Sequence, residues 1–201
     1  MLEKSTSAPA QTDLPATPLG LHHTAFVTQD AVATVDFYTR VLRMPLIATV
    51  INTEIAVTNE PFPYMHLFFR MWDGSCIAFF ESPGLPPPSP PSNVAYSIFN
   101  HLALNVGSRE QVDSWAKYLD SLAVEYVIKD HGIIYSLYLH DPSGNRLELT
   151  CSVDNSWQEL GEAAKEDMRQ WAEMKKKANG DVEAMRAWLR EHKKYPGQQA
   201  H

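Results

Sequence analysis

Two histidines and one glutamate have the residue types and spacing for metal chemistry in this chain. His23 and His101 each lie near the start of a short alternating run, and Glu148 lies between Leu147 and Leu149. A carboxylate between apolar neighbours is costly to bury without a cationic partner. Glu148 therefore either points to solvent from an exposed sheet face, as alternating polar residues do, or faces an ion.

An internal repeat relates the two histidines. Residues 99–103 match residues 21–25 at a shift of 78, which aligns His101 with His23. Self-similarity at a fixed shift is the signature of a duplicated structural unit. We therefore expect the two histidines to occupy equivalent positions, each near the start of the first strand of its own unit.

The ends of the two units match at a shift of 70, which places Glu148 on Ala78. If the units pair about a pseudo-twofold axis, the symmetry brings His23, His101 and Glu148 together, with Ala78 in the fourth position. Two imidazoles and one carboxylate can hold a divalent metal and leave positions for water, substrate or oxygen. This donor set suits Fe(II), and it leaves Mn(II), Zn(II), Ni(II) and Co(II) open.

The elements that must position these residues follow the order β-α-β-β-β in the first unit. Periodicity predicts a strand over 21–27, a helix over 30–42, and strands within 46–57, 64–71 and 76–81. Asp73-Gly74 is expected to form the hairpin turn before the last strand. A segment with six prolines, residues 82–93, predicts an extended connector.

The same order begins again after the connector. Ser108 and Gln111 predict the start of a second helix as a capping box. Three strands are expected over 126–129, 134–139 and 146–151. Asp141-Pro142-Ser143-Gly144 suits a type I turn that joins the last two strands into a hairpin.

The sequence thus predicts an α+β protein of two tandem βαβββ modules that pair into a U-shaped metal-binding cleft, with a C-terminal helical tail. The expected boundaries are a flexible tail 1–18, a first module 19–82, a Pro-rich linker 83–97, a second module 98–153, a helical extension 154–195 and a tail 196–201. In the extension, Ser156 and Glu159 predict the cap of one helix, Gly180 its end, and Asp181 the cap of a second. The extension either covers a sheet face or builds a homodimer.

Composition excludes several classes of partner. A net charge of −7 argues against nucleic acid, and no apolar run approaches the roughly 20 residues of a membrane helix. The first residues lack the apolar segment of a signal peptide, so we expect a cytoplasmic protein. Cys76 and Cys151 are expected to be free buried thiols, since two cysteines do not make a disulfide framework.

Four segments resemble the vicinal oxygen chelate superfamily, which includes glyoxalase I, type I extradiol ring-cleaving dioxygenases, fosfomycin resistance proteins and bleomycin-binding proteins. The matching residues are 21–26, 36–42, 100–104 and 141–149, within a resemblance that spans about 20–152. It implies paired modules around a metal held by His23, His101 and Glu148. Glyoxalase I sites have a fourth ligand where this chain has Ala78, so three ligands look like the extradiol dioxygenases. Those enzymes also carry a tyrosine where this chain has Tyr138.

One departure concerns the acid or base. Extradiol enzymes place a histidine in the first module, which aligns loosely with Ser75 here, and serine cannot replace an imidazole near neutral pH. His66 and His131 are the alternative candidates, beside Tyr138. His22 is expected to point away from His23 on a regular strand and not to be a ligand.

The leading hypothesis is an Fe(II) extradiol-type dioxygenase that uses O2 and a small catecholic or vicinally oxygenated substrate. A glyoxalase-like lyase or isomerase, or an epoxide-opening enzyme with a divalent metal, is the second. A non-catalytic protein that binds an aromatic ligand, of the bleomycin-resistance type, is the third.

Overall fold

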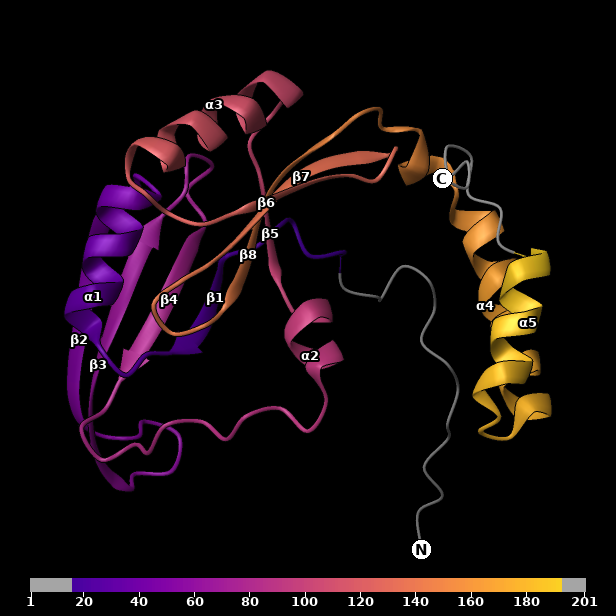
Figure 1. Ribbon diagram of the computed structural model, residues 1–201. Coiled ribbons are helices and arrows are strands. Elements are labelled where there is room, and N and C mark those ends of the chain that lie inside the picture. The colour runs from indigo at the N-terminus through magenta and orange to yellow at the C-terminus, as the bar shows by residue number, and fades with distance from the viewer. Residues whose placement is uncertain (1–15, 193–201) are drawn as a thin grey trace, which may run out of the picture. The chain divides into compact units, whose positions relative to one another are not determined.

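The computed structural model describes residues 16–192 of the chain. The tail predicted for 196–201, and residues 1–15 of the tail predicted for 1–18, lie outside this described part. The chain divides into two compact units, Met1–Pro86 and Pro87–His201. We call them unit 1 and unit 2 and describe each by itself (Figure 1).

Unit 1 is a four-stranded mixed sheet with one helix against it (Figure 1). The strand order is β1 (His23–Val27), β4 (Cys76–Glu81), β3 (Pro61–Arg70) and β2 (Leu46–Glu54). β1 runs parallel to β4, and the other neighbours are antiparallel. The predicted helix is present as α1 (Ala31–Asp36), which continues into a π-helical turn, η2 (Phe37–Val41).

The two faces of the unit 1 sheet have different roles. One face packs on the helix, where the Tyr38 ring lies 5.0 Å from the Phe69 ring and 4.9 Å from the Phe79 ring, between centroids. All three side chains are fully buried, so this is the core of the unit. Because side chains alternate along a strand, the opposite face carries His66 and Phe68 of β3.

Unit 2 repeats the same sheet (Figure 1). Its order is β5 (Leu102–Asn105), β8 (Arg146–Ser152), β7 (Ile134–His140) and β6 (Val127–Asp130), with β5 parallel to β8. α3 (Arg109–Ser121) covers one face with buried Val112, Ala116 and Leu119. The predicted cap is confirmed, because the Gln111 backbone N–H donates to Ser108 Oγ at 3.3 Å.

Strand register confirms that the two units are copies. Ala25 pairs with Ala78 in unit 1, and Ala103 pairs with Glu148 in unit 2. On the other side of the same strands, Phe68 pairs with Ala78, and Tyr138 pairs with Glu148. Ala78 and Glu148 therefore occupy equivalent positions, as the repeat predicted.

Both predicted hairpin turns are present at equivalent places. In unit 2 the Gly144 N–H donates to the Asp141 carbonyl at 2.9 Å, and in unit 1 the Gly74 N–H donates to the Met71 carbonyl at 3.1 Å. Both glycines have positive φ, 80° and 91°, a region that favours glycine. These turns bring β8 back beside β7 and β4 back beside β3.

A short helix, α2 (Val94–Phe99), was not predicted from the sequence. It begins after the last proline of the connector, where the Asn93 side chain accepts the Ala95 N–H at 2.8 Å. Six residues are too few to show a helical period, which is why periodicity did not find it. β5 begins at Leu102, so His101 lies next to the start of its strand, as the repeat predicted.

The C-terminal extension is helical, as predicted, and forms η3 (Ser156–Glu159), α4 (Gly161–Ala178) and α5 (Val182–His192). The capping box at Ser156 and Glu159 is wrong. These residues form a separate 3₁₀ turn, and the Ser156 hydroxyl bonds to Asp154 instead. The second cap is confirmed, because Asp181 Oδ1 accepts the N–H groups of Glu183 and Ala184 at 2.9 and 3.0 Å. None of the helices described within 16–192 has the length and apolar character needed to cross a membrane.

Candidate functional site

Unit 2 brings together four of the six predicted site residues. His101 precedes β5, Glu148 lies on β8, Tyr138 lies on β7, and His131 lies in the turn between β6 and β7. Tyr138 is directly opposite Glu148 in the antiparallel register. The residues flanking both, such as Leu137 and Leu149, point to the other face and pack in the core with α3.

His101 and Glu148 face each other through atoms that both accept hydrogen bonds. His101 Nδ1 lies 2.9 Å from the Phe99 carbonyl oxygen, which can only accept, so Nδ1 carries the hydrogen. In a neutral ring, Nε2 then has no hydrogen, and it lies 2.9 Å from Glu148 Oε2. Two bare acceptors at this distance repel. The contact therefore requires either a proton shared by the two atoms or a metal cation bound by both.

The pair fits a metal ligand set. Two ligands at right angles about a metal, with bonds of about 2.1 Å, lie about 3 Å apart. The observed 2.9 Å between His101 Nε2 and Glu148 Oε2 agrees with that separation. A histidine that donates its other N–H to a backbone carbonyl is also the usual arrangement of a metal ligand, because the carbonyl fixes the ring and its tautomer.

Glu148 is buried, with 2% of its surface exposed, and its second oxygen is fully occupied by hydroxyl donors. Oε1 accepts from Ser136 Oγ at 2.5 Å and from the Tyr138 hydroxyl at 3.0 Å. Ser136 is itself 2.8 Å from the Thr150 hydroxyl. These donors compensate part of the cost of burying the carboxylate, and they hold Oε2 toward His101. Glu148 therefore does not point to solvent.

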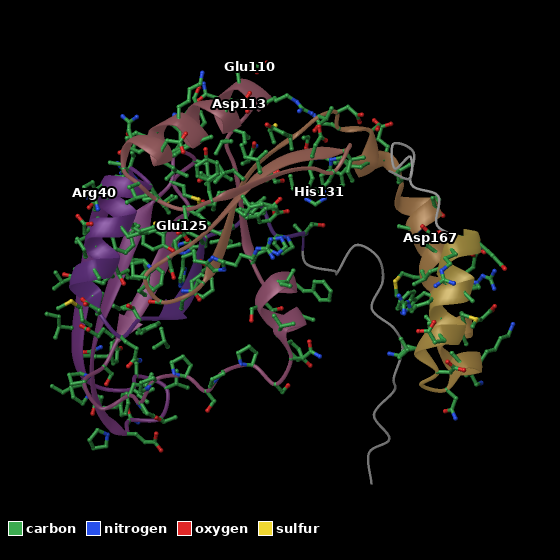
Figure 2. The ribbon with its side chains drawn as sticks, in the orientation of Figure 1. Arg40, Glu110, Asp113, Glu125, His131 and Asp167 are labelled. Atoms are coloured by element: carbon green, nitrogen blue, oxygen red, sulfur yellow. The ribbon has the colours of Figure 1, made fainter. Side chains whose placement is uncertain are left out.

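Tyr138 links Glu148 to His131. Because the Tyr138 hydroxyl donates to Glu148, its oxygen accepts from His131 Nε2, 3.0 Å away. Burial, followed by the hydrogen bond to Glu148, raises the pKa of Tyr138, so the phenol is neutral near pH 7. Figure 2 shows His131 on the side of the sheet opposite Asp113, which belongs to α3.

Unit 1 holds the other two predicted residues, His23 and His66. Their ring centroids lie 6.3 Å apart, and the Phe68 ring lies near both. The expectation that His22 points away from His23 is wrong, because the Nδ1 atoms of the two rings lie 2.7 Å apart. The regular strand begins only at His23, so strand alternation does not govern His22. One ring must donate to the other, which leaves His23 Nε2 as the nitrogen outside this contact.

His66 is held as a neutral ring among aromatic side chains. It stacks on Phe80 with centroids 3.7 Å apart. Burial, followed by the charge of His23, lowers the pKa of His66. Its Nε2 is buried and has no hydrogen-bond partner among the residues that the structure describes.

Ser75, which aligns loosely with the acid or base of extradiol enzymes, has a structural role. It is buried in the turn between β3 and β4, where its hydroxyl donates to Asp73 Oδ1 at 2.6 Å. This bond is the main cause of the lowered pKa of Asp73. Cys76 and Cys151 are free and buried, as predicted.

Among residues 16–192, no group of three His, Cys, Asp or Glu side chains is arranged to hold a metal ion. Two residues of unit 2, Ser136 and Arg146, lie near the histidine–glutamate pair and were not predicted from the sequence. Ser136 could have been found, because it lies two positions before Tyr138 and so shares its face.

Comparison with known proteins identifies the family. Residues 20–149 match the model described as Glyoxalase/Bleomycin resistance protein/Dioxygenase superfamily. A curated protein of Bacillus subtilis (strain 168), "Putative ring-cleaving dioxygenase MhqA", is 30% identical over 139 residues. The match covers 67% of this chain and 41% of that protein, so the chain spans about two fifths of the relative's length.

Two solved structures share the fold. The glyoxylase/bleomycin resistance protein/dioxygenase domain from Frankia sp. EAN1pec has a TM-score of 0.54 at 14% identity, and the match covers 68% of this chain and 99% of that one. A "putative dioxygenase" from Bacillus subtilis subsp. subtilis str. 168 has a TM-score of 0.51 at 22% identity, with 66% and 40% covered. Members of this superfamily are mostly metal-dependent enzymes that act on small molecules, typically with a divalent metal. With more than half of its length matched by the family model, the chain belongs to the glyoxalase/bleomycin resistance protein/dioxygenase superfamily.

Proposed function

We propose that the chain is a metal-dependent enzyme, an Fe(II) extradiol-type ring-cleaving dioxygenase that acts on a small catecholic or vicinally oxygenated substrate. The observation that carries the proposal is the 2.9 Å distance between two acceptor atoms, His101 Nε2 and Glu148 Oε2. The carboxylate of Glu148 is buried. His23 of unit 1 is the third ligand in this proposal. The relative named as a ring-cleaving dioxygenase supports the choice of reaction.

The chemistry that Fe(II) supplies when bound is Lewis-acid activation of a substrate hydroxyl and electron exchange with O2. Ser136 and Tyr138 keep Glu148 Oε1 occupied, so that Oε2 stays directed at the site. The Tyr138 oxygen also lies on the open face of β7, where it can accept a hydrogen bond from a substrate hydroxyl and orient it. Its raised pKa keeps the phenol protonated, so that it continues to donate to Glu148.

Two histidines of this chain are candidates to move the proton. His131 Nε2 is hydrogen-bonded to the Tyr138 oxygen, so a proton can pass between the imidazole and the phenol without a change of partner. His66 offers a neutral ring with a buried Nε2 that lacks a partner among the described residues, which suits a base. We propose that His131 and Tyr138 pass a proton between them, and that His66 acts as the general base contributed by unit 1.

A second candidate, a metal-dependent lyase, isomerase or epoxide-opening enzyme, is favoured by one observation. Ser75 is committed to the Asp73 turn, so no imidazole occupies the position where extradiol enzymes carry theirs. A non-catalytic protein that binds an aromatic ligand is the third candidate, favoured by the rings of Tyr64, Phe68 and Phe80 in unit 1. The buried acceptor pair weighs against it, because a simple binder has no need of a metal site.

The first test separates an enzyme from a binder by metal content. Glu148→Gln keeps the size of the side chain and removes its charge, and we expect the affinity for Fe(II) to fall at least about 100-fold. Glu81→Gln is the matched control, because Glu81 also lies on a strand and its Oε1 accepts the Ala31 N–H at 3.1 Å. Iron is measured after anaerobic reconstitution of the full chain. An unchanged iron affinity in Glu148→Gln would overturn the assignment of Glu148.

The second test separates the two enzymatic candidates by oxygen consumption. The Fe(II)-loaded protein is mixed with a panel of catechols, and O2 uptake and the absorbance of the ring-opened product are followed together. We expect uptake on at least one vicinal diol, and none with Glu148→Gln. A stoichiometric iron site that consumes no O2 with any diol would favour the lyase or isomerase.

A further inference from the structure

Arg146 contacts the neighbours of the proposed site from two directions. It is the first residue of β8, two positions before Glu148. Its guanidinium carbon lies 4.3 Å from the centroid of the Tyr138 ring. Its Nη1 donates to the carbonyl of Ile98 at 2.8 Å. One side chain therefore joins the tyrosine of the site to the chain segment that leads into His101.

The Ile98 carbonyl belongs to the last turn of α2, where carbonyls have no partner within the helix. Arg146 satisfies Ile98, and His101 Nδ1 satisfies the next carbonyl, that of Phe99. α2 has six residues, none of them buried, and so short a helix is not stable by itself. The direction of the Phe99 carbonyl, which fixes the His101 ring, therefore depends on the contact with Arg146.

The contact with Tyr138 acts on the other half of the site. A planar guanidinium that lies over an aromatic ring restrains the ring in the plane it already occupies. That plane directs the Tyr138 hydroxyl at Glu148 Oε1, 3.0 Å away. Arg146 thus contacts the Tyr138 ring directly and the segment that holds His101 through the Ile98 carbonyl.

We propose that Arg146 is a positioning residue, which holds the His101 ring through the end of α2 and the Tyr138 ring by stacking, so that both face Glu148. This inference rests on the proposed function in one respect, namely that the His101 and Glu148 pair binds a metal. Its positioning half does not need the metal, and the two can be tested apart.

The same sheet offers a matched control on its opposite face. The Arg109 guanidinium carbon lies 4.0 Å from the centroid of the Tyr135 ring, and its Nη2 donates to Asp130 at 2.8 Å. The Tyr135 hydroxyl donates to Asp113 on α3 and does not reach Glu148. Arg109→Met therefore removes an equivalent Arg–Tyr pair and one positive charge without removing a contact of His101, Tyr138 or Glu148.

The first measurement is the affinity of the full chain for Mn²⁺, by titration calorimetry after chelator treatment. We expect Arg146→Met to bind Mn²⁺ about tenfold more weakly, the lower end of the effect of outer partners on metal affinity. Arg146→Lys retains a charged donor for the Ile98 carbonyl but cannot stack as a plane, so an intermediate affinity is expected. Arg109→Met should bind as the unchanged protein does.

The second measurement reports the His101 ring without any metal. In protein labelled with ¹⁵N-histidine, long-range ¹H–¹⁵N correlation identifies the tautomer, and His101→Ala assigns the signal. We expect Nδ1 to carry a hydrogen throughout the unchanged protein and Arg109→Met, and a fraction without that hydrogen, hence a mixture of ring states, in Arg146→Met.

The outcomes separate the two ideas. An unchanged tautomer in both Arg146→Met and Arg146→Lys overturns the inference. Any loss of Mn²⁺ affinity would then reflect the loss of charge alone. A mixed tautomer with weakened Mn²⁺ binding supports both ideas. If the unchanged protein binds no Mn²⁺ and the tautomer still becomes mixed in Arg146→Met, the proposed metal site fails and the positioning role stands.

Discussion

The open faces of the two sheets have the same register and opposite chemistry. Unit 2 places Glu148 opposite Tyr138, with Ser136 two residues away, and two hydroxyls bind the carboxylate. Unit 1 places Ala78 opposite Phe68 at the equivalent positions. Where unit 2 has hydroxyl donors, unit 1 has rings.

The difference teaches that the carboxylate is buried in the sheet where hydroxyl groups donate hydrogen bonds to it. The equivalent of Ser136 in unit 1 is His66, whose Nε2 is buried and lacks a partner among the residues described. A glutamate in place of Ala78 would find neither hydroxyl. The charged ligand of the proposed site therefore comes from unit 2.

The largest effect is expected from forcing unit 1 to resemble unit 2. Ala78→Glu buries a carboxylate without donors, and we expect it to lower the free energy of unfolding by about 3–5 kcal/mol in urea denaturation at pH 8. Adding Phe68→Tyr and His66→Ser supplies the two hydroxyls and should restore at least about 1 kcal/mol. Ala78→Met is the control for size. If Ala78→Glu costs no more than Ala78→Met, the comparison between the units is wrong.

The next effect concerns the hydroxyl that unit 1 lacks. Tyr138→Phe removes the donor to Glu148 and the partner of His131, so we expect kcat/KM to fall about 10- to 100-fold on the best catechol of the panel. Tyr135→Phe is the matched control on the same strand. Its hydroxyl donates to Asp113 at 2.9 Å on the opposite face, so that change should cost about 1 kcal/mol of stability and leave kcat/KM unaltered. Equal losses of kcat/KM in both variants would remove Tyr138 from the site.

The smallest effect is a pH dependence that belongs to unit 1. Because burial and His23 hold the pKa of His66 below its ordinary value of about 6.5, the unfolded chain takes up that proton at higher pH than the folded chain does. The contribution of His66 to stability is therefore lost as pH falls below about 6.5. His66→Phe removes this loss. The stability of the variant relative to the unchanged protein should therefore rise as the pH is lowered from 8 to 5. Since the ring is partly exposed, we expect a rise of less than about 1 kcal/mol. A difference that is constant over this range would show that His66 does not titrate differently on folding.

Much of the scaffold could be predicted from local patterns. Alternation and helical spacing located the strands and the main helices. Glycines in the sequence marked both hairpin turns, and both adopt positive φ in the structure. The shift of 70 residues in the sequence alone aligns Glu148 with Ala78, and the strand register agrees. The capping box at Ser156 failed because an equally local alternative, the bond to Asp154, satisfied the serine hydroxyl.

The chain by itself determined the duplication, the element order and the residue types available for a site, because these depend on periodicity and turn chemistry within a few residues. Tertiary structure alone decided that His22 contacts His23, that Glu148 is buried with one oxygen bound and the other facing His101, and that Arg146 reaches the end of α2. Except for the two adjacent histidines, such contacts join residues from different elements. They depend on side-chain directions and on which donor satisfies which acceptor, and no local pattern encodes that choice.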